Sequence, residues 1–100
     1  MSGFKLITCV MQEKLSLDIV KYLQEEKKIL TANTYSARGS TFVEFLDVRQ
    51  MDVLTVVVDE QKADEVFEYI YYEAKIDRPH GGMIFQELLG RSTSYELPKT

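Results

Sequence analysis

The most regular pattern in the chain lies in its second half. Apolar residues between Ala63 and Ala74 recur at the spacing of one face of an α-helix, which predicts a helix there. An earlier run has the same period, with Ile19, Val20 and Leu23 forming its apolar stripe. Ser16 is the candidate N-cap of this first helix, and the charged run 25–28 forms its solvated end.

Strand-forming segments surround these two helices. The predicted strands are Phe4–Met11, Ile29–Tyr35, Met51–Val58 and Met83–Leu89, with a further extended stretch at Phe42–Leu46 after a break of small residues. The run Met51–Val58 is the richest in β-branched residues, which is typical of a central strand with both faces buried. Asp59 ends it and is the candidate cap of the second helix.

The order of these elements is β-α-β-β-α-β. It predicts an α+β, ferredoxin-like fold: a four-stranded antiparallel sheet with both helices on one face, formed by residues 1–100 as a single domain. The first and third strands carry apolar side chains on both faces. Since no segment remains to cover the second face, we expect other copies of the chain to cover it in a homo-oligomer.

Composition narrows the range of functions. The chain has 100 residues, 45% of them hydrophobic and 28% charged, and a formal net charge of −4 with no basic block. Nucleic-acid binding is therefore not expected. The first residues lack a basic leader and a long apolar span, so we expect a cytoplasmic protein that is not inserted into a membrane. The single cysteine, Cys9, is expected to be a small buried hydrophobic residue.

No pattern in the sequence indicates catalysis. His80 is the only histidine, and no metal-ligand spacing surrounds it. The glutamates of the second helix fall on its polar side, and the hydroxyls of residues 92–94 have no nearby base in a recognisable motif. Tyr69 and Tyr72 are expected to pack against a neighbouring subunit. We therefore expect a protein that is not an enzyme and holds no metal.

Two glycines, Gly81 and Gly82, stand directly before the last predicted strand. Glycines turn the chain at low cost, and the backbone amides they expose can also hold a phosphate. Similar weak anion-binding signals occur at Arg38 and Gly39 and at Arg91. Together they make a phosphate-bearing ligand a candidate.

The chain resembles, along its whole length, the PII-like signal proteins, which are small trimeric sensors related to the nitrogen regulators. The similarity runs through KLIT at residues 5–8, LTANT at 30–34, VEFL at 43–46, VVVDEQKADEV at 56–66 and HGGMIF at 80–85. The chain departs from the family's G-D-G-K-I-F-like loop, because Met83 stands where a phosphate-binding lysine is usual. The family's long mobile loop is shortened to Ser36–Thr41, and Arg91 is the one candidate left of a later arginine pair.

The resemblance implies a homotrimer with a ligand cleft between neighbouring subunits. It places Val10 and Thr31 at the base of a nucleotide, Arg38 and Gly39 at the start of the mobile loop, and His80, Gly81, Gly82 and Arg91 near the phosphates. The implied effectors are ATP, ADP, AMP, a cyclic nucleotide or bicarbonate, and the implied partner is a membrane transporter. Two alternatives stay open on the same architecture: a CutA-like trimer linked to metal tolerance, and an acylphosphatase-like hydrolase.

Overall fold

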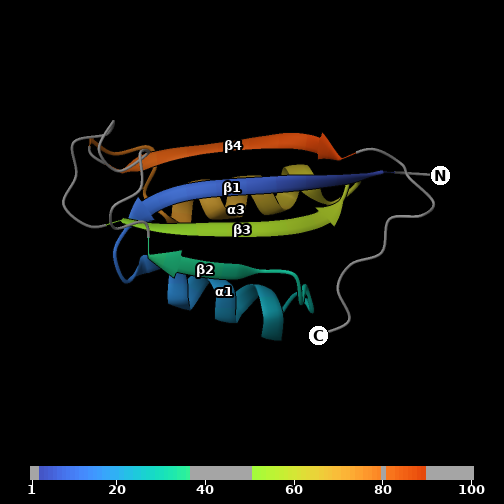
Figure 1. The fold of residues 1–100 in the computed structure, drawn as a ribbon, viewed down its shortest axis with the longest axis horizontal. Coiled ribbons are helices and arrows are strands. Elements are labelled where there is room, and N and C mark those ends of the chain that lie inside the picture. Colours follow the sequence, from blue (N-terminus) through green and yellow to red (C-terminus); the bar gives the residue numbers. More distant parts are fainter. Residues whose placement is uncertain (1–2, 37–50, 80, 90–100) are drawn as a thin grey trace.

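The chain folds in the predicted order, β1-α1-β2-β3-α3-β4 (Figure 1). The structure is a computed structural model that describes residues 3–36, 51–79 and 81–89. The elements are β1 (Phe4–Gln12), α1 (Leu15–Glu25), β2 (Asn33–Ser36), β3 (Met51–Asp59), α3 (Ala63–Glu73) and β4 (Gly82–Leu89). The extended stretch expected at Phe42–Leu46 lies outside the described residues.

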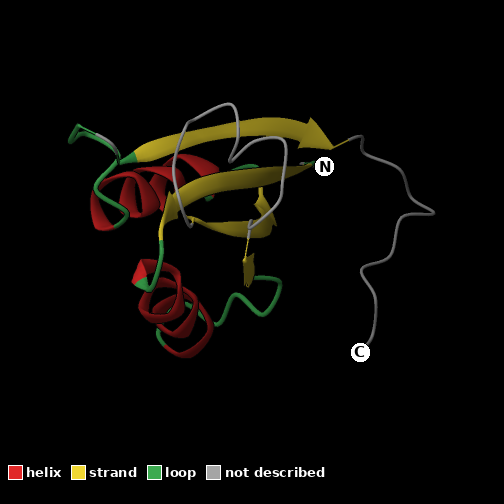
Figure 2. Ribbon diagram, turned by 60° about the vertical axis from the view of Figure 1, so that its left-hand side comes forward, coloured by secondary structure: helices red, strands yellow, loops and turns green. Residues whose placement is uncertain are grey.

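The four strands form one antiparallel sheet in the order β2-β3-β1-β4. The two longest strands are central, and they pair over their full lengths, from Phe4 opposite Asp59 to Gln12 opposite Met51. Both helices lie on the same side of the sheet (Figure 2). The predicted ferredoxin-like arrangement is therefore confirmed.

The main core lies between the sheet and the helices. Every second residue of β1 and β3 points toward the helices, and the apolar stripes of the two helices pack against these residues. The buried side chains of this layer include Ile7, Cys9, Met11, Leu54, Val56, Val58, Ile19, Leu23, Val66 and Ile70. Removal of this much apolar surface from water is the dominant force that holds the helices on the sheet.

The other side of the sheet, called the open face below, is also apolar. The strand register places Thr8, Thr55 and Phe85 in one row across it, and Leu6 and Val57 in the next. None of the described elements packs over this face, and Phe4 and Phe85 each remain 37% exposed there. The prediction of apolar side chains on both faces is thus confirmed.

One end of the open face has a small cluster of its own. Val10, Met51 and Val53 are buried together, and Met83 packs against them from β4. The strand register brings these residues together, because Val10 lies opposite both Val53 and Met83. The cluster fixes the sheet at the end where the double glycine enters β4.

Ser16 does not cap α1, contrary to the sequence-based expectation. The helix begins at Leu15 after Lys14, which has a left-handed backbone (φ 79°) and makes no side-chain cap. Ser16 is fully buried, donates a hydrogen bond to Asp52 Oδ2 (2.7 Å) and accepts one from the Thr34 hydroxyl (2.7 Å). It therefore connects α1 to β3 and β2, while Asp52 also accepts the Lys14 N–H (3.2 Å).

Asp59 does not cap α3 either. Its carboxylate accepts the backbone N–H of Gln61 (2.8 Å) and its carbonyl accepts that of Lys62 (2.9 Å), so it forms the turn between β3 and the helix. Lys62 is the residue before the helix, and it makes no side-chain cap. Both helices thus start without the side-chain caps that the sequence suggested.

Strand β2 begins four residues later than predicted, at Asn33. The carbonyl of Ala32 accepts a hydrogen bond from the Gln24 side chain (3.1 Å). The strand register would place Thr31 opposite Val57. The Thr31 hydroxyl, rather than its backbone, makes the hydrogen bonds to Val57. It donates to the Val57 carbonyl (2.6 Å) and accepts a hydrogen bond from the Val57 N–H (3.1 Å). The hydroxyl of Thr31 therefore continues the hydrogen bonding of the sheet without a strand.

Replacement of Thr31 by valine is expected to lower the free energy of unfolding by about 1–2 kcal/mol, because the Val57 N–H and carbonyl lose their partner while the side chain keeps its shape. Urea unfolding measures the change. The matched variant Thr31→Ser keeps the hydroxyl and should retain most of the stability. Equal losses in the two variants would contradict the role given to the hydroxyl.

Candidate functional site

The double glycine is required by the backbone around it. Gly82 has a φ of +118°, which side-chain-bearing residues rarely adopt, and a Cβ atom there would collide with the carbonyl of Val10. A Cβ on Gly81 would collide with the carbonyl of Lys75. The N–H of Gly81 donates to the Arg78 carbonyl (3.0 Å), which closes the turn. Close packing alone is therefore enough to explain both glycines.

Met83 is part of the open face. It lies opposite Val10 in the register and packs against the cluster of Val10, Met51 and Val53. An apolar side chain at this position therefore has a packing partner in this chain. This contact accounts for methionine here without reference to a ligand.

A second region of interest is a cavity of about 460 Å³ beside Thr31, at the opposite end of β3. Three lysines and one aspartate contribute to its walls: Lys27, Lys28, Lys62 and Asp59. We call it the lysine cavity. The positive charges of its walls suit a small anion. The Thr31 hydroxyl beside the cavity is already used, because it donates a hydrogen bond to the Val57 carbonyl and accepts one from the Val57 N–H.

The structure separates two of the predicted site residues within one copy of the chain. Val10 lies opposite Val53, whereas Thr31 lies level with Val57, four residues further along β3, or about 13 Å at the usual rise of a strand. Gly81 and Gly82 lie at the Val10 end. Four further predicted residues lie outside the described residues: Arg38, Gly39, His80 and Arg91.

Sequence reasoning missed Lys28 and Lys62 as candidate ligand-binding residues. Lys28 follows α1 with a left-handed backbone (φ 58°), and Lys62 directly precedes α3. In the sequence both belong to charged stretches that are typical of solvated helix ends. The pairing of β2 with β3 brings them to one cavity, and the spacing of 34 residues gave no local signal for it.

Cys9 is fully buried in the main core, as predicted, and burial raises the pKa of its thiol to about 12. We expect no reaction of the folded protein with a disulfide reagent at pH 8, and rapid reaction in urea. Because the thiol of the unfolded chain ionises near pH 9.0, stability should also fall as the pH rises from 9 toward 12. Rapid labelling of the folded protein would contradict this environment.

The part of the chain that the structure describes contains no group of three histidine, cysteine or acidic residues placed to hold a metal ion. Its helices are all too short or too polar to cross a membrane. Tyr69 stacks on Tyr22 of α1 within the same chain, and its expected contact with a neighbouring subunit stays a prediction.

The β-α-β-β-α-β order, the antiparallel sheet and the two helices on one face define a ferredoxin-like fold. Among solved structures, the chain is similar to PII from Arabidopsis thaliana bound to citrate, with a TM-score of 0.66 and 19% sequence identity over 85% of this chain and 76% of that one. No protein-family model matches the sequence, and no curated protein matches it. The similarity therefore establishes the fold.

Proposed function

We propose that the chain is a PII-like sensor without enzymatic activity. It assembles as a homotrimer, binds a small anionic effector at clefts between subunits and modulates a partner protein, which we take to be a membrane transporter. The observation that carries the proposal is the PII-like fold combined with an apolar open face. The fold positions the effector, and the open face provides the contact between copies.

The open face supports the assembly. It displays Phe4, Leu6, Val57 and Phe85 in adjacent rows of β1, β3 and β4. Exposed apolar patches of this kind on small domains usually mark interfaces. Three copies that bury these rows against one another would form clefts at their edges, and each cleft would combine residues of two chains.

The lysine cavity supports an anionic effector. Among the described residues, Lys27 forms an ion pair with Glu65 at 3.0 Å, whereas Lys28 and Lys62 form none and Lys62 acts on Glu65 only at longer range. The similar PII structure is bound to citrate, a small anion. We therefore place the negatively charged part of an adenine nucleotide, a cyclic nucleotide, bicarbonate or a carboxylate at this cavity. Such an effector regulates a partner when it binds two conformations of the sensor with unequal affinity.

The proposal is tested by calorimetric titration with ATP, ADP, AMP, cyclic AMP, bicarbonate and citrate, together with light scattering to measure the mass in solution. A trimer that binds at least one of these anions is expected. A monomer that binds none of them would refute the proposal.

The position of the site is tested by Lys62→Gln and Lys28→Gln. Each removes one charge from the lysine cavity and should weaken binding of the anion by roughly threefold to fivefold, as expected for partly exposed charges. Lys21→Gln removes an exposed charge of α1 away from the cavity and is the matched control. Equal losses in all three variants would indicate a general effect of net charge.

A further inference from the structure

Strand β2 runs beside β3 over only part of the length of β3 (Figure 1). The pairing of the two strands begins at Asn33, although the sequence before it also predicts a strand. If the same register continued, Thr31 would lie opposite Val57, and Leu30 would lie opposite Val58. A longer β2 would therefore fill the space beside the last residues of β3.

The hydrogen bonds of Val57 are compatible with a strand at this place. Its N–H and its carbonyl both face Thr31, and in an antiparallel pair one residue of the neighbouring strand can bond to both groups. Here the Thr31 hydroxyl does the work of that residue's backbone, because it donates to the carbonyl and accepts from the N–H. The backbone of Thr31 could make the same two bonds, so the polar groups of Val57 are satisfied in either arrangement.

Only two residues depart from the path of a longer strand. Ala32 is already buried in the main core, on the side of the sheet where the register would place it, opposite Val56. Leu30 and Thr31 form a turn instead, and the Leu30 side chain is 78% exposed. In a longer β2, Leu30 would lie beside Val58, which is buried on the helix side. A change in few backbone dihedral angles thus separates the two arrangements, and the strand would remove part of Leu30 from water.

The lysine cavity occupies the space that the longer strand would fill. Its walls include the turn residues and the end of β3, namely Leu30, Thr31, Val57 and Val58. Neighbouring strands lie about 4.8 Å apart, so an extended β2 would bring the backbone of residues 30 and 31 directly against Val57 and Val58. No room for a ligand would remain between them. The cavity and the longer strand therefore exclude each other.

We propose that residues 30–32 form a two-state element. In the turn state, which the structure shows, the Thr31 hydroxyl bonds to Val57 and the lysine cavity is present. In the strand state, the Thr31 backbone makes these bonds, β2 begins at Leu30 and the cavity is closed. An anion in the cavity stabilises the turn state, because the strand state has no place for it. The role of the anion rests on the proposed function, whereas the exchange between the two states does not.

The two states are tested without an effector, by NMR of ¹³C,¹⁵N-labelled Thr31→Val and Thr31→Ser. Valine removes the hydroxyl that holds the turn state, so the ratio of strand state to turn state should rise by roughly fivefold to thirtyfold, the factor that matches the loss of stability expected for this variant. The ¹³Cα and ¹³Cβ shifts of residues 30–32 should move toward strand values, or show exchange toward them by relaxation dispersion. Serine keeps the hydroxyl and should leave the shifts unchanged. Turn-type shifts without exchange in Thr31→Val, or equal changes in both variants, would overturn the proposal.

The role of the anion is tested by titration of the same proteins with citrate. Citrate should return residues 30–32 of Thr31→Val to turn-type shifts, and its apparent affinity should fall by the factor by which the turn state is depleted. Addition of Leu30→Asn to this variant, which favours the turn, should restore the affinity. Equal affinity in the parent and in a Thr31→Val protein that has strand-type shifts would overturn the coupling. If citrate binds to none of the proteins but the shifts of Thr31→Val and Thr31→Ser differ as expected, the two states are supported and the proposed role of this anion is wrong.

Discussion

Replacement of Gly82 by alanine is expected to lower the free energy of unfolding by about 3 kcal/mol or more. The residue has a φ of +118°, and the new Cβ would meet the Val10 carbonyl, which is part of the central strand β1. Neither atom can move without breaking the pairing of β1 with β4. Urea unfolding followed by circular dichroism measures the loss.

Lys75→Gly is the matched control for this prediction. Lys75 has a left-handed backbone (φ 60°) in the turn before β4, where a side chain costs roughly 1 kcal/mol and glycine does not. The glycine should leave stability unchanged or raise it by up to about 1 kcal/mol. If Gly82→Ala proved as stable as the parent but failed to bind an effector, the glycine would belong to the ligand site and the structural explanation would be wrong.

Phe85→Asp is expected to convert the proposed trimer into a monomer. Phe85 stands in the middle row of the open face, opposite Thr8, and an aspartate there would be buried without a partner in each of three copies. A penalty of about 3 kcal/mol in each of the three copies would raise the concentration needed for assembly by on the order of a thousandfold, because the midpoint concentration varies as the square root of the trimer dissociation constant. Light scattering over a range of concentrations measures this shift.

The control for Phe85→Asp is Leu88→Asp on the same strand. Leu88 lies opposite Lys5 and therefore points to the helix side, where it is 62% exposed. The change in charge is identical, but assembly should be unaffected. A trimer that survives Phe85→Asp, or one that is lost equally in both variants, would contradict an interface on the open face.

The sequence predicted best the elements whose signals are local. The spacing of apolar residues from Ala63 to Ala74 predicted α3, because one face of that helix packs on the sheet along its whole length. The β-branched run Met51–Val58 predicted the central strand β3, where Leu54 and Val53 are buried on opposite faces. In both cases the side chains that set the pattern also make the contacts.

The sequence predicted poorly those features that depend on distant partners. Ser16 was expected to cap its own helix, but its hydroxyl donates a hydrogen bond to Asp52, 36 residues away. Thr31 was expected in a strand, but its hydroxyl binds Val57. Each of these side chains can form a hydrogen bond either with nearby backbone or with a residue far away in the sequence, and only the assembled sheet decides between the two.

The candidate site was predictable in part for the same reason. The glycines before β4 were recognised because few residues can take their place, and the structure gives them a steric role. The lysine cavity was not recognised, because Lys28 and Lys62 meet only after β2 has paired with β3. The family resemblance indicated ligand-binding residues at both ends of the sheet, and a single copy of the chain does not bring these residues together.

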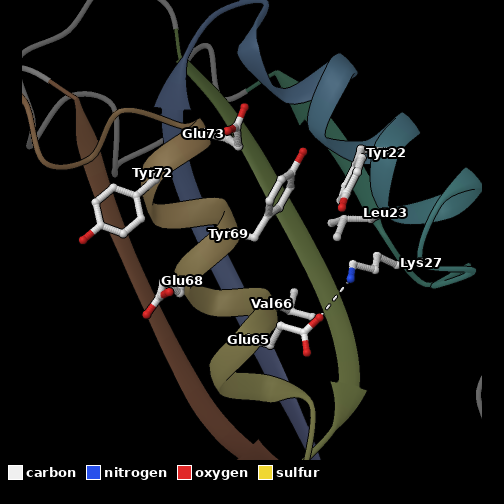
Figure 3. A pocket seen from close by; sticks show the side chains of 9 residues that line it. All are labelled: Tyr22, Leu23, Lys27, Glu65, Val66, Glu68, Tyr69, Tyr72 and Glu73. Atoms are coloured by element: carbon white, nitrogen blue, oxygen red, sulfur yellow. Dashed lines mark hydrogen bonds and ion pairs between the residues drawn. The ribbon is translucent and has the colours of Figure 1, made fainter.

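Lys27 borders the lysine cavity, but its ammonium already lies 3.0 Å from a Glu65 carboxylate oxygen (Figure 3). An anion that entered the cavity would therefore compete with Glu65 for this ammonium. The energy needed to separate the ion pair would be subtracted from the affinity for the anion. Because high salt weakens the ion pair and the attraction to the anion together, the contribution of Lys27 should depend less on ionic strength than those of Lys28 and Lys62.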